Sequence, residues 1–183
     1  MSFPYQPFYC EENAFLLMDE SPVSGLEPWL VFVSNSSRSV LMFHQSAGDN
    51  ESGCVIWDYH VFVLARADQT VWDLDCSAGF PLSVEQYLAA SFADEVPQTW
   101  HPRFRAVPAA AARRGFSSDR SHMLDAEGNY LKPPPPWSAI FHGANTLPRL
   151  LDMDHDDPSV EWLPPALDLN AFACWAGEPD SLK

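Results

Sequence analysis

The segment CVIWDYHVFVLA, which runs from Cys54 to Ala65, decides the fold of this chain. Its side chains alternate with period two and are mostly β-branched or aromatic, so we predict one long β-strand. One predicted face carries Val55, Trp57, Tyr59, Val61 and Val63, and the other carries Ile56, Asp58, His60, Phe62 and Leu64. A turn at residues 67–69 leads into a second strand over residues 70–75, which we expect to pair antiparallel with the first.

Helices and further strands surround this hairpin in the sequence. The apolar run from Ala14 to Met18 follows acids in a first turn, so we predict a helix that begins at Cys10. Ser83 and Gln86 have the spacing of a capping box at the start of a second helix. Further strands are predicted over residues 29–34, 39–43 and 103–107, and shorter helical stretches over 109–114, 147–153 and 167–175. This mixture indicates an α+β fold.

Length and charge exclude several classes of protein. The chain has 183 residues, 46% of them hydrophobic, which suits a single domain over residues 1–183. Its formal net charge is -15, whereas a nucleic-acid surface needs clustered Lys and Arg. No apolar run approaches the ~20 residues of a membrane span. We therefore expect neither a nucleic-acid partner nor a membrane partner.

The N-terminal residues and the cysteines allow predictions about the cellular compartment and about metal binding. Residues 1–6 lack the basic and apolar segments of a secretory signal, so we expect a cytoplasmic protein, with the nucleus a second location in a eukaryote. Cysteines in a reducing compartment are expected to be thiols. The four cysteines lack C-x-x-C spacing, and the acids at 152, 154 and 156 lack the glycine and glutamate of a calcium loop. We expect no metal site.

Three residues have the chemistry of a nucleophilic site. Cys10 stands at a predicted helix start, where a thiol pKa is commonly lowered, although the adjacent Glu11 and Glu12 act in the opposite direction. His60 is a polar residue in an apolar strand, and an acid from the next strand could hold its imidazole in the tautomer that accepts a thiol proton. Asp73 or Asp75 could reach the ring from that strand, and Asp73 is the favoured partner. A buried structural role for the cysteine and histidine is the alternative.

The register of the hairpin leaves the His60–Asp73 contact open. A turn centred near Arg66–Ala67 would pair the two residues directly. A turn centred on Asp68 would make Asp73 a diagonal neighbour or would require a bulge.

Several motifs in order along the chain resemble one family. They are Tyr9-Cys10-Glu11-Glu12-Asn13, Val55-Ile56-Trp57-Asp58-Tyr59-His60-Val61, Trp72-Asp73-Leu74-Asp75, Phe104-Arg105, Ser118-Asp119-Arg120-Ser121-His122-Met123 and Pro133-Pro134-Pro135-Pro136. Together they resemble the protein N-terminal glutamine amidohydrolases from about Tyr9 to Trp137, whereas residues 147–183 match poorly. The resemblance implies a papain/transglutaminase-like α+β fold, in which a helix carrying the nucleophile packs against an antiparallel sheet flanked by helices.

The resemblance also implies a reaction. It places the catalytic residues at Cys10, His60 and Asp73, the three already singled out on physical grounds. Cys10 would attack the side-chain carboxamide of an N-terminal glutamine, release ammonia and form a thioester that water hydrolyses to glutamate. No metal or organic cofactor is required. The family acts in the Arg/N-degron route, where the glutamate product can be arginylated.

The proposed reaction also predicts which residues bind the substrate and which molecules the protein binds. A free α-ammonium calls for carboxylates near the pocket, and the candidates are Glu11, Glu12, Asp58 and Asp119. The expected partners are proteins or peptides that begin with glutamine, bound by a monomer. The alternatives are a papain-like protease or transglutaminase that uses the same three residues, and a non-catalytic protein that binds N-terminal glutamine.

Overall fold

An antiparallel sheet forms the centre of the molecule in the computed structural model, which describes residues 3–48, 52–157 and 159–178. The strand order is β6-β5-β4-β1-β7-β8. The bounds are β1 (Trp29–Ser34), β4 (His60–Ala65), β5 (Thr70–Trp72), β6 (Leu82–Ser83), β7 (Arg103–Pro108) and β8 (Leu167–Asp168). All neighbouring strands pair antiparallel. The predicted α+β class with an antiparallel sheet is confirmed, and the papain/transglutaminase-like fold stays a prediction.

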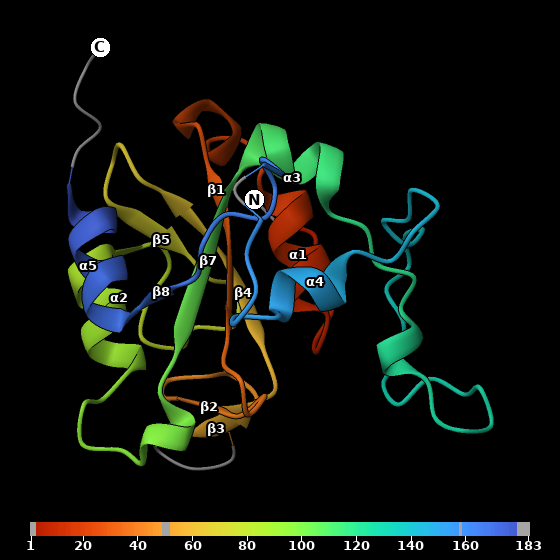
Figure 1. Cartoon of the computed structure of the whole chain (residues 1–183), viewed down its shortest axis with the longest axis horizontal. Helices are drawn as coiled ribbons and strands as arrows, with labels where there is room; N and C mark the ends of the chain where they lie inside the picture. Colours follow the sequence, from red (N-terminus) through yellow and green to blue (C-terminus); the bar gives the residue numbers. More distant parts are fainter. Residues whose placement is uncertain (1–2, 49–51, 158, 179–183) are drawn as a thin grey trace.

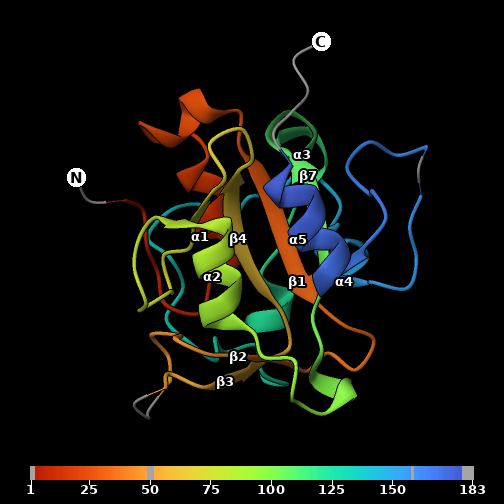
Figure 2. The same ribbon diagram turned by 90° about the vertical axis from the view of Figure 1, so that its left-hand side faces the viewer.

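Helices cover both faces of this sheet. The helices are α1 (Cys10–Leu17), α2 (Val84–Ser91), α3 (Ala109–Gly115), α4 (Leu147–Leu151) and α5 (Leu169–Gly177), with single turns η1 (Val23–Leu26), η2 (Gln98–Trp100) and η3 (Ser121–Met123). Figure 1 shows α1, α3 and α4 on one side of the sheet, and Figure 2 shows α2 and α5 on the other. The core is accordingly divided into two apolar clusters, one on each face. None of the helices in the described ranges is long and apolar enough to span a membrane.

The predicted long strand is wrong in one respect, because it is broken at Asp58 and Tyr59. Its first part is β3 (Val55–Trp57), which pairs with β2 (Val40–Met42) in a separate two-stranded sheet. Its second part is β4, at the centre of the main sheet. The Ser34 hydroxyl donates to the Asp58 carbonyl at 2.7 Å, and the Asp58 carboxylate accepts from the Tyr59 N–H at 3.0 Å, so both groups are satisfied outside a ladder. The break leaves His60 as the first residue of a central strand.

The hairpin register selects the diagonal arrangement of His60 and Asp73. Val63 lies opposite Trp72 and Ala65 opposite Thr70, so the turn is centred between Ala67 and Asp68. β5 ends at Trp72, and Asp73 follows it in a turn. Asp73 therefore reaches His60 from a loop rather than from a directly paired position.

The helix predictions near residues 10 and 83 are confirmed. α1 begins at Cys10, and the Ser83 side chain accepts from the Gln86 N–H in a complete capping box at the start of α2. The predicted helix over residues 167–175 is wrong at its start, since residues 167–168 form the edge strand β8 before α5 begins.

A buried arginine ties the later part of the chain to the sheet. Arg105 on β7 is fully buried, and its guanidinium donates to the carbonyls of Leu150, Asp152, His155 and Pro164. Because each carbonyl needs a donor away from water, one side chain organises the segment between α4 and β8.

Residues 117–146, which we call the arm, run between α3 and α4. The arm projects from the body at the right of Figure 1. It contains η3 and a short bridge between Leu124 and Tyr130.

Candidate active site

The start of α1 is held in place by its own sequence. The Asn13 side-chain amide donates to the Gln6 carbonyl at 2.8 Å, and its oxygen accepts from the Gln6 N–H at 2.9 Å. The fully buried Tyr9 precedes the helix, and α1 packs against β4. These contacts fix Cys10, which is partly buried in the first turn.

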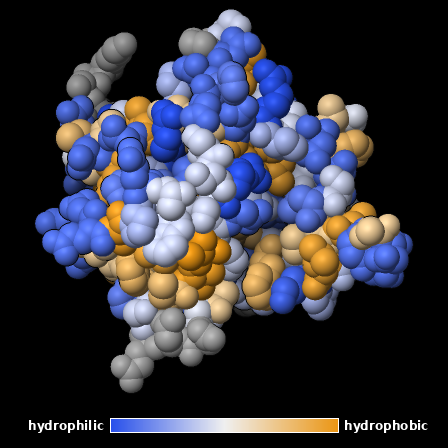
Figure 3. All heavy atoms as spheres, turned by 60° about the horizontal axis from the view of Figure 1, so that its bottom comes forward, coloured by the Kyte–Doolittle hydropathy of each residue, from blue (hydrophilic) through white to orange (hydrophobic). Residues whose placement is uncertain are grey.

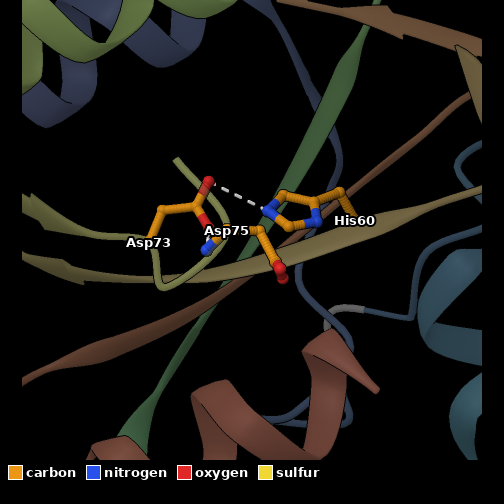
Figure 4. Close-up of side chains that lie close together, drawn as sticks. All are labelled: His60, Asp73 and Asp75. Atoms are coloured by element: carbon orange, nitrogen blue, oxygen red, sulfur yellow. Dashed lines mark hydrogen bonds and ion pairs between the residues drawn. The ribbon is translucent and has the colours of Figure 1, made fainter. Parts of the chain in front are cut away.

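The predicted pair of His60 and Asp73 is present in the structure. His60 Nε2 lies 2.9 Å from Asp73 Oδ2, and the two residues are only 1% and 3% exposed. Tyr87 Oη donates to the same carboxylate oxygen at 2.8 Å, and the Asp75 N–H donates to Asp73 Oδ1 at 3.0 Å. Figure 4 shows the Asp73 contact to one ring nitrogen of His60, with the Asp75 carboxylate on another side of the ring.

The charges of this pair reinforce one another. Burial alone would raise the pKa of Asp73, but His60 and the hydrogen bonds to the carboxylate lower it overall. Burial alone would lower the pKa of His60, but the Asp73 carboxylate raises it overall. Asp73 is therefore ionised and accepts from Nε2–H, which leaves Nδ1 of His60 to accept a proton.

The thiol of Cys10 has a different environment. Burial raises its pKa, Glu11 and Asp75 raise it further, and the Val61 N–H opposes them. Cys10 Sγ donates a hydrogen bond to Glu11 Oε2 at 3.8 Å, and within the described ranges it makes none to His60. The position of Cys10 at a helix start does not lower the pKa of its thiol overall.

Cys10 and His60 line one cavity of about 240 Å³. The cavity is also lined by the titratable or charged side chains of Asp58, Tyr59, Asp75, His122 and Lys132. Its apolar walls are formed by Phe8, Trp57, Met123 and Leu131. Residues of the arm therefore form one wall and residues of the body the other. Figure 3 shows the surface hollowed between the arm, at the right, and the body, with hydrophobic residues on both sides. The cavity therefore brings a thiol, an imidazole and several charged side chains together in a space that a small polar group could enter.

Comparison with known proteins decides the family. The sequence profile of the N-terminal glutamine amidases matches residues 5–168. The chain belongs to this family.

Relatives from distant organisms agree with this assignment of the amidase family. A protein of Oryza sativa subsp. indica is 35% identical over 176 residues, which cover 85% of this chain and 75% of the relative. A Homo sapiens protein is 34% identical over 169 residues (86% and 80%), and one of Drosophila willistoni is 36% identical over 151 residues (78% and 74%). All three carry the name protein N-terminal glutamine amidohydrolase. The resemblance inferred from the motifs is confirmed.

Glu12, one of the four acids expected to bind substrate in this amidase, holds the arm instead. It is fully buried and makes two contacts to Arg120, from Oε1 to Nε at 2.6 Å and from Oε2 to Nη2 at 2.7 Å. The Trp137 indole also donates to Oε2 at 2.7 Å. Arg120 and Trp137 both belong to the arm, so this ion pair fixes the arm against α1.

Arg120→Met should destabilise the protein strongly, because it leaves the Glu12 carboxylate buried without its counterion. We expect a loss of about 3–5 kcal/mol in the free energy of unfolding. Arg114→Met is a matched control, since Arg114 pairs with Glu161 at the surface, where such pairs contribute less than about 1 kcal/mol. Urea unfolding followed by tryptophan fluorescence measures both. Equal losses in the two variants would contradict this role of Glu12.

Glu11 contacts Cys10, which lines the cavity. It is 0% exposed, and its two oxygens face different groups. Oε2 accepts from Cys10 Sγ, whereas Oε1 accepts no hydrogen bond from the residues that the structure describes. The His122 Nε2 lies 3.4 Å from Oε1 and 3.0 Å from the Tyr59 hydroxyl. Tyr59 and His122 therefore separate this carboxylate from the cavity.

The remaining two candidate acids differ in position. Asp58 is exposed and lines the cavity, at the break between β3 and β4. Asp119 is exposed as well, but its carboxylate accepts from the Ser121 N–H at 3.0 Å and from the Asn145 side chain at 2.7 Å. It stabilises a loop of the arm and is not among the residues that line the cavity.

Asp75 is a site residue that the sequence interpretation considered only as another partner for His60. It is mostly buried, lines the cavity, and accepts from the Tyr5 hydroxyl at 2.6 Å and from the Ser46 hydroxyl at 3.2 Å. With His60 and Asp73 it offers metal-ligand atoms within 4.8 Å of one another, although two of those atoms already bond to each other. Its signal in the sequence is the Asp73-Leu74-Asp75 spacing after a strand.

Proposed function

We propose that this chain hydrolyses the side-chain carboxamide of an N-terminal glutamine, which gives glutamate and ammonia. The observation that supports this most directly is that Cys10 and His60 line one cavity, with Asp73 bonded to the far nitrogen of the His60 ring. The rice and human relatives carry the name of an enzyme with this activity, protein N-terminal glutamine amidohydrolase. We further propose a single catalytic domain with a papain/transglutaminase-like arrangement, because the helix that carries the nucleophile packs against the strand that carries His60.

The proposed mechanism uses only side chains and backbone of the chain itself. His60 Nδ1 accepts the Cys10 thiol proton, and the sulfur attacks the carboxamide carbon. Asp73 orients the ring and stabilises the imidazolium. In the first turn of α1 the N–H groups of Glu12 and Asn13 donate to the Tyr9 carbonyl, so those of Cys10 and Glu11 are the candidates to stabilise the oxyanion. His60 returns the proton to the departing ammonia and then activates the water that hydrolyses the thioester.

Recognition of the free amine is assigned to the acids nearest the cavity. Asp58 lines it, and Glu11 contacts Cys10 and has an oxygen that accepts no hydrogen bond from the residues that the structure describes, so these two are proposed to attract the α-ammonium. Glu12 and Asp119 are proposed to shape the arm that closes the cavity. We also propose that the protein is a monomer, that it acts in the cytoplasm, and that its reaction is a step of the Arg/N-degron type.

A panel of peptides tests the proposed reaction. A peptide with a free N-terminal glutamine should release ammonia and gain the mass expected for exchange of an amide for an acid. N-acetylation should lower kcat/KM by at least about 10- to 100-fold, because it removes one charge-assisted interaction. Internal glutamine and N-terminal asparagine should react poorly, since the carboxamide no longer reaches the sulfur. Ammonia release and mass spectrometry measure each case.

Other outcomes of the same panel identify the alternatives. Cleavage of the main chain would indicate a protease, and transfer of the glutaminyl group to an added amine would indicate a transglutaminase. Binding of the peptide without release of ammonia would indicate a non-catalytic binding protein.

A further inference from the structure

The hydrogen bond of the Cys10 thiol points away from the base. Sγ donates to Glu11 Oε2, whereas Nδ1 of His60 is the atom that the reaction requires to accept this proton. The His60–Asp73 pair is already assembled, with its 2.9 Å contact buried. The resting site therefore has its base in place and its nucleophile protonated.

The charges around the sulfur explain why the proton stays there. Glu11 on α1 and Asp73 and Asp75 after β5 are carboxylates that act on the thiol. His60 on β4 is the facing group that can become cationic near the sulfur, and on the arm His122 lies 3.4 Å from the far oxygen of Glu11. Tyr59 and Tyr5 are neutral, because burial, together with Glu11 for Tyr59 and Asp75 for Tyr5, raises the pKa of each phenol. A thiolate here would face three carboxylates, which strongly disfavours it.

One of these carboxylates is incompletely paired. Glu11 is fully buried, and its Oε1 accepts no hydrogen bond from any residue in the described ranges. A buried carboxylate oxygen without a hydrogen-bond donor is costly, and the nearest cationic group to Oε1 is the His122 ring, whose Nε2 lies 3.4 Å away. Tyr59 and His122 line the cavity and separate Oε1 from it, so a cation in the cavity reaches Oε1 when it takes the place of the His122 ring.

We propose that the α-ammonium of the substrate supplies the hydrogen bond that Glu11 Oε1 lacks, and that by pairing with Glu11 it releases the Cys10 thiol to His60. The inference rests on the proposed function and adds to it, because the amine becomes a requirement for the chemical step as well as for binding. The ammonium contacts Oε1 in place of the His122 ring. The thiol proton then moves to His60 Nδ1, which yields a thiolate–imidazolium pair, and it returns to sulfur when an unreacted ligand leaves.

The enzyme would then distinguish an N-terminal glutamine from an internal one before any covalent bond breaks, through the protonation state of Cys10. Neutralising one adjacent charge shifts a thiol pKa by about one unit, which is about tenfold in thiolate concentration. An internal glutamine that enters the cavity brings no ammonium, so it meets a protonated thiol. The same arrangement limits the reaction of Cys10 with oxidants and other electrophiles in the absence of substrate.

The reactivity of Cys10 toward iodoacetamide tests this proposal without a reaction at glutamine. An alanine-start peptide with a free amine supplies the ammonium and leaves the space beside the sulfur empty. At a concentration that nearly abolishes deamidation of a glutamine-start peptide, it should speed the alkylation of Cys10 by about tenfold. Its N-acetylated form should have no such effect. Peptide mapping by mass spectrometry assigns the modified cysteine.

A pair of variants provides a second, independent test. Glu11→Gln removes the opposing charge and keeps the shape, so Cys10 should alkylate about tenfold faster than wild type without any peptide, and the peptide should no longer stimulate it. Glu127→Gln, an exposed acid of the arm, should behave as wild type. The wild-type measurement stands even where Glu11→Gln folds poorly.

Several results would overturn the inference. Alkylation that slows or stays constant when the free-amine peptide is bound would show that the ammonium does not activate the thiol. Absence of inhibition by that peptide would show that the site does not bind a free α-ammonium. Failure of the proposed function is distinguishable, because it appears as no ammonia from glutamine-start peptides, whatever the alkylation rates.

Discussion

Replacement of Cys10 by alanine should abolish release of ammonia from a glutamine-start peptide. The variant keeps the cavity and the His60–Asp73 pair but has no atom that can form the thioester, so we expect kcat to fall by about 10⁴-fold or more. Continuous ammonia detection, checked by the mass of the product peptide, measures the loss. The alanine occupies a partly buried position in the first turn of α1, where the fold should tolerate it.

Cys174→Ala is the matched control for this variant. Cys174 is exposed on α5, which packs on the opposite face of the sheet from α1. Its loss should leave kcat within about twofold of wild type, since substitutions far from a site usually change little. Ammonia release by Cys10→Ala at a rate near wild type would exclude Cys10 as the nucleophile.

Asp73→Asn should lower kcat by a similar factor, about 10⁴-fold, although it removes no reacting atom. An asparagine amide facing His60 donates to Nε2, which forces the remaining proton onto Nδ1. The ring then presents N–H to the sulfur and can no longer accept the thiol proton. Steady-state kinetics with a glutamine-start peptide measures this effect, and circular dichroism checks the fold.

Tyr87→Phe gives the graded comparison for this variant. It removes the hydroxyl that donates to Asp73 Oδ2 at 2.8 Å but leaves the carboxylate and the tautomer of His60 unchanged. We expect a loss of only about tenfold, the size of one hydrogen bond to a charged group. Equal losses in the two variants would contradict the tautomer argument and would favour general damage to the site.

The parts of the site that local sequence patterns control were predictable. A helix start is set by nearby residues, so the acids after Cys10 and the capping box at Ser83 located α1 and α2. The pairing of His60 with Asp73 was predictable as well, because adjacent strands of a hairpin bring their residues together. The turn centre, and with it the diagonal arrangement, depends on a single residue of register and required the structure.

Tertiary contacts decided the rest. The break at Asp58 and Tyr59 follows a hydrogen bond from Ser34, which lies 24 positions earlier, and alternation of apolar residues continues unchanged through it. The pairing of Glu12 with Arg120 joins residues 108 positions apart, so no local pattern separates this structural acid from Glu11 beside it. Arg105 likewise gave no local sign that it would organise the segment between α4 and β8.

The covalent intermediate offers the most direct measurement of the central claim. A glutamine-start peptide is mixed with excess enzyme, quenched in acid within one turnover, and the digest is mapped by mass spectrometry. The account predicts a glutamyl thioester on Cys10, at the mass of the peptide less ammonia, that is absent when the peptide is N-acetylated or the enzyme carries Cys10→Ala. A thioester on another cysteine, or formation of the glutamate product by Cys10→Ala, would contradict it.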